Sequence, residues 1–258
     1  MRPHTDFKPE TSKAILLIGD SGSGKTNLAF EFPNPGIIDF GDANINNAVE
    51  RHRGKPFKWG RVDLADDGKT IAPHLRWQRS LDLLVEAGKD PDVQTIVDDS
   101  LSMLQVVLTD YLVDVGSRGG EKLPTVAGEK QMNVSLWEPF ARALRSRIVL
   151  ARSLGKTYIM TCHVKVDENE LTATKEQRPL ISGQMASKLA SLYTDYWMCE
   201  ATPTPEARYQ PRGVRYFVRT APTNRIKLKS SVPDLPPEFE FSWASWQAHL
   251  AKRNGGVK

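Results

Sequence analysis

Short apolar runs alternate with amphipathic segments along most of the chain. The runs that have the length and the β-branched content of buried strands are residues 14–18, 36–40, 95–97 and 157–162. The segments with apolar side chains at helical spacing are residues 74–87, 100–115 and 136–154. Strands that alternate with helices predict an α/β fold with a mainly parallel central sheet flanked by helices on both faces.

The C-terminal third has a different pattern. Two further apolar runs, residues 196–199 and 216–218, lie closer together and predict a C-terminal β-hairpin extension of the sheet. We expect one core domain at residues 13–240, an N-terminal tail at residues 1–12, and a C-terminal helix or tail at residues 241–258.

Candidate chemistry begins directly after the first apolar run. Residues 19–26 read Gly-Asp-Ser-Gly-Ser-Gly-Lys-Thr, which matches the phosphate-binding loop G-x-x-x-x-G-K-[ST] between a strand and a helix. Lys25 would reach the β- and γ-phosphates of a nucleotide, and the Thr26 hydroxyl would hold Mg²⁺, so we expect ATP and Mg²⁺ as cofactors. The predicted cofactor-binding residues are Gly19, Asp20, Ser21, Gly22, Ser23, Gly24, Lys25, Thr26 and Asn27.

Two pairs of acidic residues follow later apolar runs. Asp98 and Asp99 end the run at 95–97 and predict a second Mg²⁺ ligand. A simple rule of an apolar strand followed by an acid favours Asp98, whereas the Asp-Ser sequence favours Asp99, and the choice stays open. Hydrolysis also needs a group that orients the attacking water. Asp42 is the first candidate for that role and Asp39 is the second.

Three other polar residues are catalytic candidates by position. His163 ends the fourth apolar run, where a side chain can contact the γ-phosphate. Lys227 and Lys229 alternate on one face of a short predicted strand. These lysines could reach a phosphate across a subunit boundary, as arginine fingers do. The alternative is a solvated edge strand protected by lysines.

The distribution of charge adds a candidate partner. The net charge of the 258-residue chain is only +4, but residues 207–229 contain seven basic side chains and no acidic one. Such a stretch indicates either a polyanionic partner or a solvated basic face. Because there is no apolar run of about 18 residues and no apolar stretch in residues 1–10, we expect no membrane association and a cytoplasmic location.

The phosphate-binding loop, the paired acids, His163 and the late lysine pair together resemble the RecA-like ATPase core. More narrowly, over residues 13–240 they resemble the phage RecA-like nucleotide-binding proteins of the Sak-type single-strand annealing group. That family has a catalytic Glu after its second strand, and here Gly41 stands near that position between Asp39 and Asp42.

The resemblance implies a DNA-stimulated ATPase in the host cytoplasm that binds single-stranded DNA and promotes annealing or strand exchange. It implies a homo-oligomer, a filament or ring with ATP between subunits, and a single-strand DNA-binding protein as a further candidate partner. It also implies two DNA-binding loops, residues 116–130 and 165–184. The candidate contacts to DNA are Arg118, Lys122, Lys130, Lys165, Lys175, Arg178 and Lys188.

Two other classes of function fit the same motifs. One is a different P-loop enzyme, such as a helicase, a packaging motor or a small-molecule kinase. The other is a regulatory nucleotide-binding module with little turnover, and Gly41 in place of an acid favours it.

Overall fold

The computed structural model describes residues 13–41, 45–127, 129–169, 174–182, 185–203, 214–232 and 235–255. Within these residues, nine strands form one sheet. They are β1 (Ala14–Gly19), β2 (Pro35–Asp39), β3 (Lys58–Arg61), β4 (Thr95–Asp99), β7 (Thr157–Asn169), β8 (Thr174–Pro179), β9 (Asp195–Pro203), β10 (Val214–Arg219) and β11 (Glu238–Phe239). A separate small hairpin pairs β5 (Thr125–Val126) with β6 (Glu129–Lys130).

The α-helices are α1 (Lys25–Glu31), α2 (Ile45–Arg51), α3 (Pro73–Lys89), α4 (Leu101–Arg118), α5 (Trp137–Ser153), α6 (Met185–Leu189) and α7 (Trp243–Gly255). Short 3-10 turns at Val134–Leu136 and Ala190–Leu192 lead into α5 and follow α6. Over the described ranges, we find no helix with both the length and the apolar character needed to cross a bilayer.

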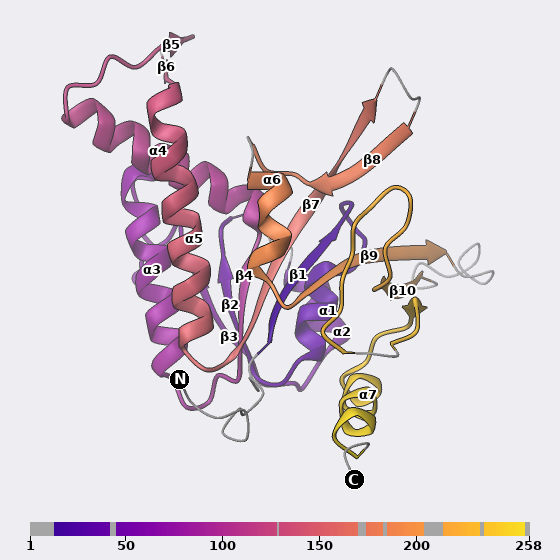
Figure 1. Cartoon of the computed structure of the whole chain (residues 1–258). Coiled ribbons are helices and arrows are strands. Elements are labelled where there is room, and N and C mark those ends of the chain that lie inside the picture. Colours follow the sequence, from indigo (N-terminus) through magenta and orange to yellow (C-terminus); the bar gives the residue numbers. More distant parts are fainter. Residues whose placement is uncertain are drawn as a thin grey trace, which may run out of the picture.

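The strand order is β11-β10-β9-β1-β7-β4-β2-β3, with β8 paired to β7. All pairings from β9 through β3 are parallel, whereas β10 and β11 extend the sheet in antiparallel fashion. Figure 1 shows α3, α4 and α5 on one face of this sheet and α1 and α2 on the other. The α/β prediction, including the hairpin extension formed by β9 and β10, is confirmed.

The alternation of side chains along the strands builds two cores, one on each face of the sheet. Leu16 of β1 is buried in the cluster that contains Leu104 of α4, whereas its neighbour Ile15 is buried with Phe30 of α1. Successive residues of a strand point to opposite faces, so a strand buried on both faces must be apolar throughout. This explains the continuous apolar run of β1.

The C-terminal helix packs against the second of these cores. Trp246 of α7 is 1% exposed, and its ring meets Trp197 of β9 edge to face at 5.0 Å. Helix α7 is therefore anchored to the sheet on the face that carries α1. The predicted N-terminal tail, residues 1–12, lies outside the described residues.

The polar segment after β7 differs from its prediction. Residues 165–179 were expected to be part of a loop, but the chain continues as β7 to Asn169 and returns as β8, from Asn169↔Thr174 to Val164↔Pro179. Figure 1 shows this hairpin projecting beyond the rest of the sheet. Beyond Val164 and Val166 the two strands of the hairpin are almost entirely polar, so they give little of the alternation of apolar and polar residues that predicts strands.

A buried ion pair ties the helical layer to β4. The Arg147 guanidinium of α5 donates from Nε to Asp98 Oδ2 at 2.9 Å and from Nη2 to Asp98 Oδ1 at 2.8 Å. The Tyr158 hydroxyl donates to Asp98 Oδ2 at 2.5 Å, and Arg147 also donates to the Ser80 carbonyl of α3 at 3.1 Å. Burial raises the pKa of Tyr158 well above its ordinary value, so the hydroxyl keeps its proton and stays a donor.

We expect Arg147→Ala to lower the free energy of unfolding by about 3–5 kcal/mol, because Asp98 would remain as a buried carboxylate without its cation. Urea unfolding at pH 7 measures this loss. Arg142→Ala on the same helix is the matched control, since the Arg142–Glu138 pair is 73% and 79% exposed. A loss for Arg147→Ala no larger than for Arg142→Ala would contradict a structural role for this pair.

Candidate nucleotide-binding site

The phosphate-binding loop joins β1 to α1 and depends on left-handed glycines. Gly22 has φ 78° and Gly24 has φ 88°, a region that side-chain-bearing residues rarely adopt. Gly24 is also close-packed, because a Cβ there would lie 2.3 Å from Cδ1 of Tyr216 in β10. The loop can therefore keep its shape only with glycine at this position.

Lys25 lies inside the loop. Its side chain is buried, and Nζ donates to the carbonyl oxygens of Gly19 at 2.9 Å and Asp20 at 2.8 Å. Burial lowers the pKa of Lys25 below its ordinary value, while surrounding negative groups, Asp99 among them, act in the opposite direction. A bound phosphate would supply the compensating negative charge that the loop carbonyls supply only in part.

Asp99 at the end of β4 connects the loop to the neighbouring strand. Its Oδ2 accepts a hydrogen bond from Thr26 Oγ1 at 2.7 Å, and its Oδ1 accepts one from Thr161 of β7. Mg²⁺ prefers a few protein oxygens together with water and phosphate oxygens. The Thr26 hydroxyl and the Asp99 carboxylate fit that requirement and would hold Mg²⁺ beside a nucleotide.

A pocket of about 250 Å³ opens over the loop. The register places His163 of β7 beside Gly19 of β1, and His163 lines this pocket together with Lys25, Thr26 and Asp99. Its other lining residues are Ser21, Gly22, Gly24, Asn27, Asn47, Ala48, Ser100 and Tyr216. The structure therefore brings the loop, Asp99 and His163 together at the carboxyl edge of the parallel sheet, where ligands of open α/β sheets bind, although β7 continues past His163 to Asn169.

The comparisons with known proteins agree with this geometry. The family model described as an AAA domain matches residues 11–230. The chain belongs to the AAA domain family. Membership in this family makes it a P-loop NTPase, and it indicates nucleotide binding, use of Mg²⁺ and ATPase activity in general. A search of curated protein sequences gave no match.

In this AAA domain the two adjacent acids of β4 face opposite sides of the sheet. Asp98 is fully buried and its carboxylate is engaged by Arg147 and Tyr158 in the helical layer. Asp98 is therefore not placed to hold Mg²⁺ beside Thr26, because both of its carboxylate oxygens face Arg147 and Tyr158 on the other side of the sheet. The structure leaves Asp99 as the acid of this pair that lies at the loop.

The candidates for water activation have different positions. Asp39 ends β2 beside Asp99 of β4, is 4% exposed, and accepts a hydrogen bond from the Gly41 N–H at 2.7 Å. That contact engages one carboxylate oxygen in a turn at Gly41, whose φ is 104°. Asp39 is also absent from the described lining of the P-loop pocket. Asp42, the first candidate, lies outside the described residues.

The short strand predicted for Lys227 and Lys229 is not formed, and the segment pairs with β9 through an isolated bridge between Tyr196 and Lys229. Both lysines are exposed, whereas Ile226 and Leu228 between them are buried in the core. Backbone bonds of Lys229 to Tyr196, at 2.8 and 3.1 Å, align this segment with the start of β9. Neither lysine is among the described residues that line the P-loop pocket of its own chain.

Most of the candidate DNA contacts have acidic neighbours. Arg118 pairs with Asp114 at 2.6 Å, Lys165 pairs with Asp167 at 3.0 Å, and Arg178 pairs with the same Asp167. Lys175 lies 3.9 Å from Glu168, while Lys122, Lys130 and Lys188 are exposed.

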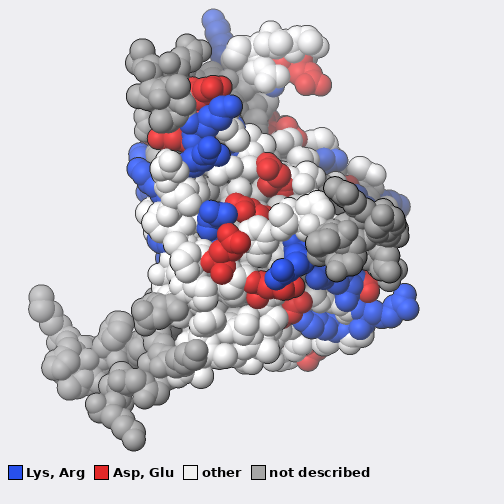
Figure 2. All heavy atoms as spheres, turned by 90° about the vertical axis from the view of Figure 1, so that its right-hand side faces the viewer, with Lys and Arg blue, Asp and Glu red and all other residues white. Residues whose placement is uncertain are grey.

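The basic stretch at residues 207–229 is also partly neutralised by the fold. Arg219 meets Glu200 and Glu238 at 3.1 Å, and Arg215 meets Glu240 at 3.2 Å. Figure 2, which views the molecule from the side of β8, β9 and β10, shows basic and acidic side chains interspersed on this face. The described part of this stretch therefore does not form a purely basic surface, although it contains no acidic residue, because other segments bring carboxylates to it.

Several residues of the site had no signal in the sequence. Thr161 holds Asp99 from the next strand, and Tyr216 lies against Gly24 although about 190 residues separate them along the chain. Asn47 of α2 also reaches the pocket. Thr161 stands two residues before His163 in the predicted strand, and this position was the only local sign that Thr161 would lie at the site.

We expect Asp99→Asn to reduce the Mg²⁺-dependent gain in ADP affinity by about 10–100-fold, in the range seen when groups that support a metal are removed. Titration calorimetry with and without Mg²⁺ measures this gain. Asp98→Asn is the matched control, and it should lower the urea midpoint but leave the Mg²⁺-dependent gain in ADP affinity of the folded protein unchanged. Equal losses of this gain in the two variants would contradict a metal role for Asp99 and a structural role for Asp98.

Proposed function

We propose that this AAA domain protein is an ATPase that binds single-stranded DNA as a homo-oligomer and promotes annealing or strand exchange. This is the activity of the phage Sak-type group that the sequence resembles. The family assignment supports the ATPase part, and the arrangement around the pocket supports the coupling to a second ligand.

The proposal is supported by the way in which the candidate DNA segments are connected to the P-loop pocket. Both candidate DNA segments are continuous with elements that start at the P-loop pocket or pass through it. Helix α4 starts after Ser100, which lines the pocket, and ends at Arg118, inside the predicted loop of residues 116–130. Strand β7 passes through Thr161 and His163 and continues into the β7–β8 hairpin. Figure 1 shows both projections at the end of the sheet toward which β1 runs.

The contacts at the pocket indicate how ATP could act on these segments. The backbone N–H of His163 donates to Ser102 Oγ of α4 at 3.3 Å, and Gln105 Oε1 of α4 accepts from the Ser182 N–H at 2.6 Å. The first two turns of α4 are thus bonded to β7 and to the segment after β8. A γ-phosphate that contacts His163 would favour one position of these elements over another. Coupling between two sites requires a ligand contact of this kind, one that differs between the two conformations.

Catalysis would use the groups already placed at the pocket. Lys25 would neutralise the β- and γ-phosphates, and Thr26 and Asp99 would hold Mg²⁺, which supplies charge stabilisation when bound. Thr161 orients the Asp99 carboxylate by its hydrogen bond. Lys227 and Lys229, exposed on the segment that lies beside the start of β9, are proposed to complete the site of a neighbouring subunit.

A second candidate is a nucleotide-binding module with little turnover. The observation that favours it is the Asp39–Gly41 contact, which engages the described acid at the end of β2 in a turn. Without another group to orient water, the site would bind ATP and hydrolyse it slowly.

The test is the ATPase rate with and without single-stranded DNA, over a range of salt concentrations. We expect stimulation by single-stranded DNA and not by duplex DNA, and a stimulated rate that falls steeply with salt, because phosphate contacts release counterions. Lys25→Ala should abolish nucleotide binding and the stimulated rate. Retained ATPase in Lys25→Ala would refute the site. ATP binding with a slow rate unchanged by DNA would favour the low-turnover module.

A further inference from the structure

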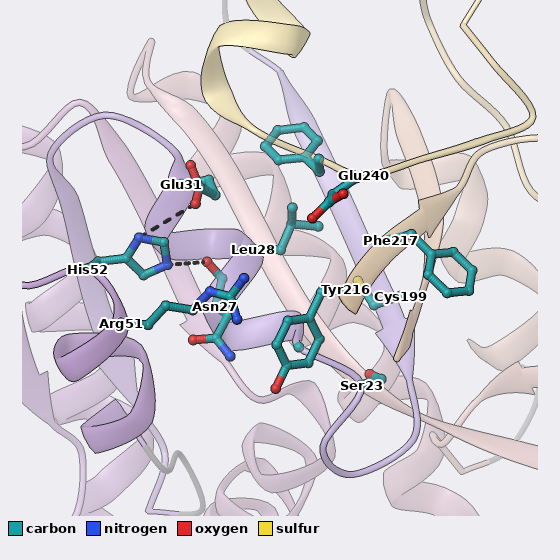
Figure 3. Close-up of a pocket in the computed structure, with 12 residues that line it drawn as sticks. Ser23, Asn27, Leu28, Glu31, Arg51, His52, Cys199, Tyr216, Phe217 and Glu240 are labelled. Carbon is teal, nitrogen blue, oxygen red and sulfur yellow. Dashed lines mark hydrogen bonds and ion pairs between the residues drawn. The ribbon is translucent and has the colours of Figure 1, made fainter. Parts of the chain in front are cut away.

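A second, smaller pocket lies against the other side of the P-loop (Figure 3). It has about 40 Å³ of internal space and is lined by residues of the phosphate-binding loop, α1, the end of α2, β9, β10 and the segment after β11. Gly24, Asn27 and Tyr216 line both this pocket and the larger P-loop pocket. The two pockets are therefore the two ends of one cleft, and Tyr216 stands at their junction.

The strand order fixes which end of a bound nucleotide would face the smaller pocket. Asp99 and Thr26 mark the metal and the γ-phosphate end, and β4, which carries Asp99, lies on the β7 side of β1. The smaller pocket includes Cys199 of β9, on the opposite side of β1. A nucleotide whose γ-phosphate lies near Asp99 would therefore direct its nucleoside toward this pocket.

Two polar groups in the smaller pocket lack an internal partner. Ser23 Oγ and Asn27 Oδ1 are buried, and neither has a hydrogen-bond partner within the described part of the chain. Ser23 as a whole is 5% exposed. Buried polar atoms are nearly always paired, so two such atoms in one pocket indicate that a ligand or ordered water supplies the missing donors.

The walls of the pocket suit a flat ring. The Arg51 guanidinium lies over the Tyr216 ring at 4.8 Å from its centroid, and Figure 3 shows Asn27, Arg51 and Tyr216 gathered at one end of the pocket. Burial raises the pKa of the Cys199 thiol to about 12, so Cys199 adds no charge. Aromatic faces and guanidinium planes are the surfaces on which nucleobases stack.

We propose that this cleft binds the adenine base of the nucleotide. The base stacks on Tyr216, and its exocyclic amino group donates a hydrogen bond to Asn27 Oδ1. Because an adenine ring is larger than the pocket, the Arg51 guanidinium moves off the Tyr216 ring when the base enters. This proposal rests on the proposed nucleotide-binding function, and it assigns base recognition to residues outside the phosphate-binding motif.

The stacking role is tested by binding of two ligands, ADP and inorganic triphosphate, to the full chain in the presence of Mg²⁺. Tyr216→Ala should weaken ADP by about tenfold or more, because one stacked base is lost, and should leave inorganic triphosphate within about twofold. Tyr216→Phe keeps the ring and should bind both ligands like the wild type. The triphosphate control separates loss of the base site from damage to the loop at Gly24.

The role of Asn27 is tested with a purine riboside diphosphate, which lacks the amino group of adenine. Wild-type protein should prefer ADP over this analogue, and Asn27→Ala should reduce that preference to about equal binding. Unchanged ADP affinity in Tyr216→Ala, or an unchanged preference in Asn27→Ala, would overturn the proposal. If wild-type protein binds neither ADP nor triphosphate, the proposed function itself fails.

Discussion

The alternation of side chains at the end of β4 is the constraint on which the rest of the structure depends. Asp98 and Asp99 are neighbours in sequence, so the pleat of the strand sends one to each face of the sheet. Asp98 binds Arg147 and fixes the layer of α3 and α5, whereas Asp99 binds Thr26 and Thr161 and fixes the phosphate-binding loop. One dipeptide thus anchors the core on one face and the site on the other.

This division gives the pocket a buried, hydrogen-bonded base from which two longer elements extend. Asp99 is followed at once by α4, and Thr161 is followed along β7 by the projecting hairpin. The two elements are bonded to each other at this edge of the sheet, since the His163 N–H of β7 donates to Ser102 Oγ in the first turn of α4. Both elements that lead to the candidate DNA segments therefore have residues at the P-loop pocket.

The sequence predicted those features that depend on local patterns. The loop at residues 19–26, the parallel strands and the position of His163 at the P-loop edge all follow from short motifs and apolar runs. The choice between Asp98 and Asp99 did not follow from such patterns. Alternation requires only that the two acids face opposite sides of the sheet, and the packing of Arg147 decides which of them faces the helical layer.

Features that depend on distant segments were not predictable in the same way. Most of the β7–β8 hairpin beyond Val166 is polar, and Tyr216 reaches Gly24 only because β9 and β10 extend the sheet beside β1. The acidic partners of Arg215 and Arg219 come from other strands and from the segment after β11, so the charge of residues 207–229 alone overstated the basic surface.

The most direct test is a crystal structure of the chain with Mg²⁺ and a non-hydrolysable ATP analogue. We expect phosphates within the loop at residues 19–26, Mg²⁺ at about 2.1 Å from the Thr26 hydroxyl oxygen and close to Asp99, and the adenine ring against Tyr216. A metal bound at Asp98, or a triphosphate bound away from Lys25, would contradict this expectation.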